Sequence, residues 1–122
     1  MTYDEIKRIL LLIDSPIEKL EMVMELGQEL QEVPQDAVCT EIAGCSSLVE
    51  ICKKNNRFWA RADSGLVRGI VAILVAMVDG KTPDEIKKID MNLYAEFSGL
   101  DINLGAGRLN GVNSMIRFFK NL

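Results

Sequence analysis

The sequence predicts an α+β fold in which a small three-stranded antiparallel sheet packs with about six helices. Helix start signals, in which a capping residue precedes a proline or an acidic residue, occur both before and after the middle of the chain. In the middle, over residues 37–62, apolar and polar residues alternate with the period of two that is typical of strands. Helices, then three short strands, then helices again is an order typical of α+β architecture.

Two helices are expected before the sheet. For the first, Thr2 and Glu5 have the spacing of a capping box. Apolar residues follow with helical spacing at Ile6, Ile9, Leu10 and Ile13. The second begins at Ser15-Pro16-Ile17-Glu18, because serine suits the N-cap and proline the first helical position, and we expect it to continue to Pro34. Its predicted buried stripe is Leu20, Val23, Met24 and Leu30.

The alternating segments in the middle of the chain predict a meander of three strands. We expect these strands within residues 37–42, 48–52 and 58–62. The turn between the second and the third is Lys54-Asn55-Asn56, since asparagine is common in tight turns. The tip that joins the first two strands is Gly44-Cys45-Ser46.

The rest of the chain predicts helices. Asp63 or Ser64 caps an apolar helix over residues 66–78, and Asp79-Gly80 follows as its C-cap. The signal of a capping residue followed by proline and acidic residues recurs at Thr82-Pro83-Asp84-Glu85, which predicts the start of a short helix.

Two more helices are expected near the C-terminus. Asp90 is the predicted cap of the first, which ends at Gly99 and contains Leu93, Tyr94 and Phe97. Gly105-Ala106-Gly107 is expected to be a loop that leads into the last helix. The apolar residues of that helix are Val112, Met115, Ile116 and Phe119.

Length and charge narrow the classes of function. The 122 residues fit one domain, at about 100–150 residues per domain, so we expect a single domain over residues 1–122. The net charge is −4, from 18 acidic and 14 basic residues without a basic stripe, which argues against a nucleic-acid partner. The longest apolar stretch, residues 69–78, is about half of the ~20 residues that span a bilayer, and the acidic N-terminus is unlike a secretory signal. We therefore expect a cytoplasmic protein with no membrane partner.

The chain contains no histidine, which excludes histidine-based catalysis and histidine-ligated zinc. Its three cysteines are an odd number, and a cytosolic compartment keeps thiols reduced. Cys39 and Cys52 fall within predicted strands, where cysteines usually act as small core hydrophobes. The spacing of Cys39, Cys45 and Cys52 also differs from common zinc-ligand spacings, so we expect no bound metal.

Cys45 is the best candidate for chemistry, because functional side chains are often placed in turns, whereas the other two cysteines fall within predicted strands. It follows Gly44 and precedes two serines. An inert turn thiol remains the alternative interpretation. Arg108 is a second candidate, since a guanidinium beside a glycine-rich loop and a helix start can hold an anion or stabilise a thiolate. The alternative for Arg108 is an exposed loop arginine.

Five sequence pieces in order resemble the SufE family of sulfur-acceptor proteins, including its CsdE branch. They span the chain from about Ile17 to the C-terminus, and all keep the spacing of the family. The pieces are Gly44-Cys45-Ser46-Ser47-Leu48-Val49, Phe58 to Ser64, Val67-Arg68-Gly69, Gly80 to Ile86, and Arg108-Leu109-Asn110-Gly111 with Met115. The chain departs from the family pattern at Ser46, at Glu50, where tryptophan is common, and at residues 103–107.

The resemblance implies a sulfur acceptor and activator for a cysteine desulfurase of the SufS/CsdA kind in iron–sulfur cluster assembly. Cys45 falls on the acceptor cysteine of the family and Arg108 on the arginine of its R-x-N-G motif. The implied fold is the SufE/NifU-like α+β fold. Pyridoxal phosphate (PLP) is expected on the desulfurase, with no cofactor on this chain. We therefore expect an accessory sulfur-transfer protein that also meets a downstream iron–sulfur scaffold, rather than an independent enzyme.

Two alternatives remain open. One is a metal or iron–sulfur scaffold that uses Cys39, Cys45 and Cys52, although thiols on alternating strand positions point in different directions. The other is a non-catalytic interaction module on the same fold.

Overall fold

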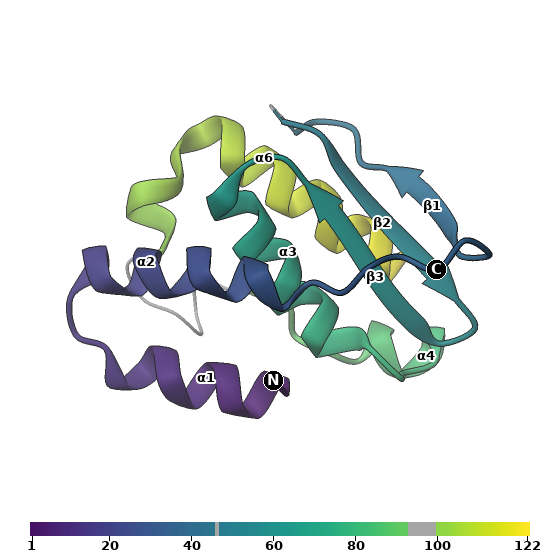
Figure 1. The fold of residues 1–122 in the computed structure, drawn as a ribbon, viewed down its shortest axis with the longest axis horizontal. Helices are drawn as coiled ribbons and strands as arrows, with labels where there is room; N and C mark the ends of the chain where they lie inside the picture. Colours follow the sequence, from purple (N-terminus) through teal and green to yellow (C-terminus); the bar gives the residue numbers. More distant parts are fainter. Residues whose placement is uncertain (46, 93–99) are drawn as a thin grey trace.

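The computed structural model describes residues 1–45, 47–92 and 100–122, with residues 100–108 described by their helical backbone alone. Figure 1 shows three strands beside a set of helices. The elements are α1 (Tyr3–Leu12), α2 (Pro16–Leu26), a 3-10 turn (Gly27–Glu29), β1 (Val38–Glu41), β2 (Val49–Lys54), β3 (Arg57–Ala62), α3 (Gly65–Val78), α4 (Pro83–Lys87) and α6 (Leu100–Lys120).

The predicted α+β fold and its antiparallel meander are confirmed. The three strands lie in the order β1-β2-β3, and both neighbouring pairs are antiparallel. Five α-helices and the 3-10 turn lie within the described residues, whereas about six helices were expected. In Figure 1, β1 is at the outer edge of the sheet, and α1 and α2 are at the opposite end of the view.

The core lies between one face of the sheet and α3. Val49 and Ile51 of β2 are fully buried, and most residues of α3 are buried as well. This helix can be apolar on every side because it packs against α1, α2, β3 and α6. Gly69 allows α3 to lie very close to α2. A Cβ built on this residue would be only 1.8 Å from the carbonyl oxygen of Val23 in α2.

Most of the capping signals in the sequence are confirmed, but Ser64, at the N-cap of α3, makes no capping hydrogen bond with its side chain. Thr2 and Glu5 form a capping box, and Thr82 and Glu85 form a second one. The Ser15 side chain accepts a hydrogen bond from the backbone N–H of Glu18, with Pro16 at the first position of α2. Gly80 follows α3 with a φ of +81°, a conformation that favours glycine.

Two sequence predictions about helix bounds are wrong. Helix α2 ends at Leu26 rather than continuing to Pro34, because the chain tightens into the 3-10 turn where Gly27 lies against Arg68 of α3. Gly105-Ala106-Gly107 is not a loop but part of α6. Each helical glycine costs about 1 kcal/mol, yet the buried Val112, Met115 and Phe119 fix the same helix against the core.

The C-terminal half of α6 is anchored to the sheet and to α4. The Phe119 ring packs edge-on against the Phe58 ring of β3, with centroids 5.6 Å apart. Lys120 Nζ donates to the carbonyl oxygens of Ile86 and Lys87 at the end of α4, and to that of Ile89. These contacts fix the position of the helix that faces Cys45.

The helix expected to contain Leu93, Tyr94 and Phe97 and to end at Gly99 lies outside the described residues. Its predicted cap, Asp90, is described, and its side chain accepts a hydrogen bond from the backbone N–H of Asn92 at 3.0 Å. Within the described residues, the helices are too short or too polar to cross a bilayer.

Candidate functional site

Cys45 lies in the loop between β1 and β2, as the sequence predicts. The backbone N–H of Ile42 donates to the carbonyl oxygen of Val49 at 2.9 Å, which closes the hairpin just before this loop. Gly44 then turns the chain with a φ of +86°, where a residue with a side chain would be strained. The Cys45 thiol is free and half-buried.

The loop lies against helix α6. A Cβ built on Gly111 would lie 3.0 Å from Cys45 Sγ, and one built on Gly44 would lie 2.9 Å from the hydroxyl oxygen of Ser114. Both glycines therefore permit a close approach of loop and helix. Ser114 is itself held, because its hydroxyl donates to the carbonyl oxygen of Asn110 and accepts from Arg117, both at 3.0 Å.

Burial sets the resting chemistry of Cys45. It raises the pKa of the Cys45 thiol above its ordinary value, so the group is a protonated thiol at neutral pH. The thiolate is the nucleophilic form of cysteine. The resting site therefore holds its thiol in a weakly reactive state.

The second predicted site residue, Arg108, lies in α6 rather than in the expected loop. Its backbone is three residues before Gly111, which is close to one helical turn. Its side chain lies outside the described part of the chain, so its role in the site stays a prediction. Gly111 and Ser114 were not singled out as site residues, although Gly111 closes the Arg108-Leu109-Asn110-Gly111 motif.

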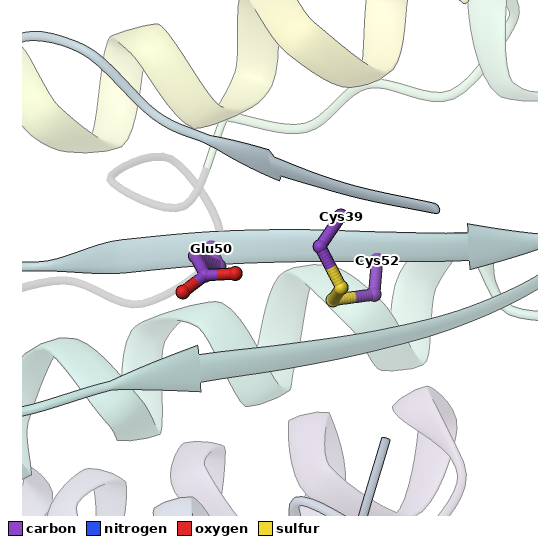
Figure 2. Close-up of side chains that lie close together, drawn as sticks. All are labelled: Cys39, Glu50 and Cys52. Atoms are coloured by element: carbon purple, nitrogen blue, oxygen red, sulfur yellow. A yellow bond between two sulfur atoms is a disulfide. The ribbon is translucent and has the colours of Figure 1, made fainter. Parts of the chain in front are cut away.

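Cys39 and Cys52 differ from expectation. They are directly opposite partners on β1 and β2, with Cα atoms 4.0 Å apart, and their sulfurs form a disulfide (Figure 2). The prediction of reduced thiols is therefore wrong for both residues, whereas the predicted core position is confirmed for Cys52 and wrong for Cys39. Cys52 is fully buried, whereas β1 is an exposed edge strand.

The structure also separates Cys45 from the other two cysteines. Among the described residues, the group that could hold a metal ion consists of Cys39, Glu50 and Cys52, without Cys45. Strand alternation places this group on the sheet face opposite to buried Val49 and Ile51, while Cys45 lies against α6. A scaffold that uses all three cysteines is therefore not supported.

The contact with Gly111 gives a prediction about the reactivity of Cys45. In Gly111→Ala, the new methyl group would meet Sγ at 3.0 Å and displace the Cys45 loop, whereas alanine favours the helix. We expect Cys45 to be alkylated several-fold faster than in the wild type, because its thiol becomes more exposed. The alkylation rate of the oxidised protein, followed by mass spectrometry, reports on this one free thiol.

Gly65→Ala is the matched control for this experiment. It places the same methyl group in α3, where it meets the flexible end of Met24 at 3.3 Å. This variant should be alkylated at the wild-type rate. An unchanged rate in Gly111→Ala would show that Gly111 does not control access to Cys45.

Comparison with known proteins identifies the family. The model of the SufE family, described as an Fe-S metabolism associated domain, matches residues 4–122. An uncharacterized SufE-like protein of Rhizobium meliloti (strain 1021) is 33% identical over an alignment of 119 residues, and the match covers 88% of this chain and 84% of the relative. The solution structure of a hypothetical protein from Thermus thermophilus has the same fold, with a TM-score of 0.76 at 14% identity over 99% of this chain and 94% of that one. The chain belongs to the SufE family.

Proposed function

We propose that this protein is a sulfur acceptor and activator for a PLP-dependent cysteine desulfurase of the SufS/CsdA kind. It would carry sulfane sulfur as a persulfide on Cys45 and deliver it to an iron–sulfur scaffold in the cytoplasm. The observation that carries this proposal is a free thiol on a hairpin loop, in a chain of the SufE family. The PLP would belong to the desulfurase, and this chain would have no enzyme activity of its own.

The transfer is a thiol exchange between two cysteines. Cys45 first loses its proton, and its thiolate attacks the outer sulfur of the persulfide on the desulfurase. A sulfur–sulfur bond forms on Cys45 while the bond within the donor persulfide breaks. The desulfurase cysteine leaves as a thiolate, ready for another cycle. Neither oxidant nor reductant is consumed.

The resting geometry suggests what the partner must contribute. Cys45 is half-buried against Gly111, and burial raises its pKa, so the isolated protein presents little thiolate. A partner that lifts the loop away from α6 would expose the sulfur and lower its pKa. We infer that docking and activation of Cys45 are coupled through this loop.

Intact-mass spectrometry tests the proposal directly. We expect incubation with an active desulfurase, PLP and cysteine to add about 32 Da per transferred sulfur atom to the protein. Digestion without reductant should locate the added sulfur on the peptide that contains Cys45. Sulfur found only on Cys39 or Cys52 would contradict the assignment of Cys45, and no added sulfur would favour a non-catalytic interaction module.

A further inference from the structure

We propose that Cys39, Cys52 and Glu50 form a zinc site when the disulfide is reduced. The site would lie on the sheet face opposite to that of Val49 and Ile51, apart from Cys45; there Cys52 is fully buried and the Glu50 side chain is 28% exposed. Figure 2 shows the three side chains close together on β1 and β2. Their ligand atoms all lie within 4.8 Å of one another.

The strand register brings the three ligands together. Cys39 and Cys52 are directly opposite, and their Cα separation of 4.0 Å fits the closely spaced kind of antiparallel pair. Glu50 lies two residues before Cys52 on β2, so both side chains leave the strand on the same face. The register of one hairpin therefore brings three donor side chains together, and breaking the sulfur–sulfur bond lets the two sulfurs separate around an ion.

The charges around this face also favour a cation. Glu41 is directly opposite Glu50, and two like charges in that relation are destabilising unless a positive charge lies near. Arg61 of β3 is such a charge: its Nη1 atom lies 3.6 Å from the Glu50 carboxylate and 4.0 Å from Cys39 Sγ. The Arg61 side chain is 54% exposed, so it can turn into solvent when a metal ion takes its place.

The donor set selects the metal. Two thiolates and one carboxylate suit Zn²⁺, which binds cysteine sulfur and carboxylate oxygen in tetrahedral sites. Three protein ligands leave the fourth position for water or for a ligand from outside. Ca²⁺ and Mg²⁺ prefer all-oxygen sites and would be excluded.

Reduction would control access to the site. A dithiol reductant gives two electrons and two protons to the Cys39–Cys52 disulfide and is itself oxidised to a disulfide. Zn²⁺ then displaces the two thiol protons as it binds. In the oxidised protein the two sulfurs are bonded to each other, so the thiolate donors are absent. The metal-binding form is therefore the one that a reducing compartment maintains.

The experiment uses the full chain in a Cys45→Ser background, so that the third thiol cannot contribute. Protein reduced with dithiothreitol is desalted anaerobically and titrated with Zn²⁺ against a chromophoric chelator. We expect one equivalent to bind to the reduced protein and none to the oxidised protein. Co²⁺ in place of Zn²⁺ should give the sulfur-to-cobalt charge-transfer absorption of thiolate ligation.

Variants then assign the ligands. Cys39→Ser lies on the exposed edge strand and should abolish the charge-transfer band without unfolding the sheet. Glu50→Gln should weaken Zn²⁺ binding at least about tenfold, while the matched control Glu21→Gln, exposed on α2, should leave it unchanged. Absence of binding by the reduced protein, or wild-type affinity in both Cys39→Ser and Glu50→Gln, would overturn the proposal.

Discussion

Cys45→Ser is expected to abolish the stimulation of a partner desulfurase while leaving docking nearly unchanged. Serine replaces one sulfur atom by oxygen and so keeps the shape of the loop. A hydroxyl is protonated far above neutral pH and forms no stable adduct with sulfane sulfur. Desulfurase turnover in the presence of cysteine and mild reductant measures stimulation, and a binding titration of the same proteins measures docking.

The physical reason is the fate of the persulfide on the desulfurase. Turnover is slow while the persulfide remains on the enzyme, so an acceptor thiol speeds the cycle by removing it. The proposed function assigns that role to the Cys45 sulfur atom. Stimulation should therefore be lost when serine replaces this sulfur by oxygen. Stimulation at the wild-type level by Cys45→Ser would instead mean that the protein activates its partner through conformation, and the sulfur-carrier proposal would fail.

Cys39→Ser and Cys52→Ser are the matched controls. Each removes a sulfur atom and the disulfide, but neither changes Cys45. We expect both to stimulate the desulfurase. Cys52→Ser should lose some stability, because it places a hydroxyl at a fully buried position.

Much of the fold could be predicted because its signals are local. Ser15-Pro16 and Thr82-Pro83 identify helix starts through hydrogen bonds to residues only a few positions away. The strands follow from alternation within six residues, and Asn55 adopts a φ of +56° in the predicted turn. The position of Cys45 on the loop between two strands follows from the same local pattern.

The features that the sequence did not predict depend on contacts between distant segments. The Cys39–Cys52 bond requires a strand register correct to one residue, and alternation alone does not fix the register. The contact between Cys45 and Gly111 joins two elements that are far apart in sequence. Gly105-Ala106-Gly107 disfavours a helix locally, yet tertiary packing of α6 overrides this preference.

Arg108→Ala is expected to slow sulfur transfer to Cys45 at least about tenfold while leaving the fold intact. The size of the rate change follows from the loss of one charge-assisted contact, which is worth on the order of 1.5–3 kcal/mol. The Arg108 backbone lies about one helical turn before Gly111, the residue that contacts Cys45 Sγ. From this position a guanidinium within reach of Cys45 would stabilise its thiolate and the sulfur passing to it. The rate of persulfide formation, followed by mass spectrometry at several desulfurase concentrations, measures the effect.

Concentration dependence separates chemistry from docking in the Arg108→Ala variant. A rate that stays low at saturating partner concentration places Arg108 at the transfer step, whereas recovery at high concentration makes it a docking residue. Arg108→Lys keeps the charge without the planar fork and should restore part of the rate. Arg8→Ala, which removes an exposed arginine from α1, should transfer sulfur at the wild-type rate. An unchanged rate in Arg108→Ala would remove Arg108 from the site, and lost helicity by circular dichroism would make its role structural.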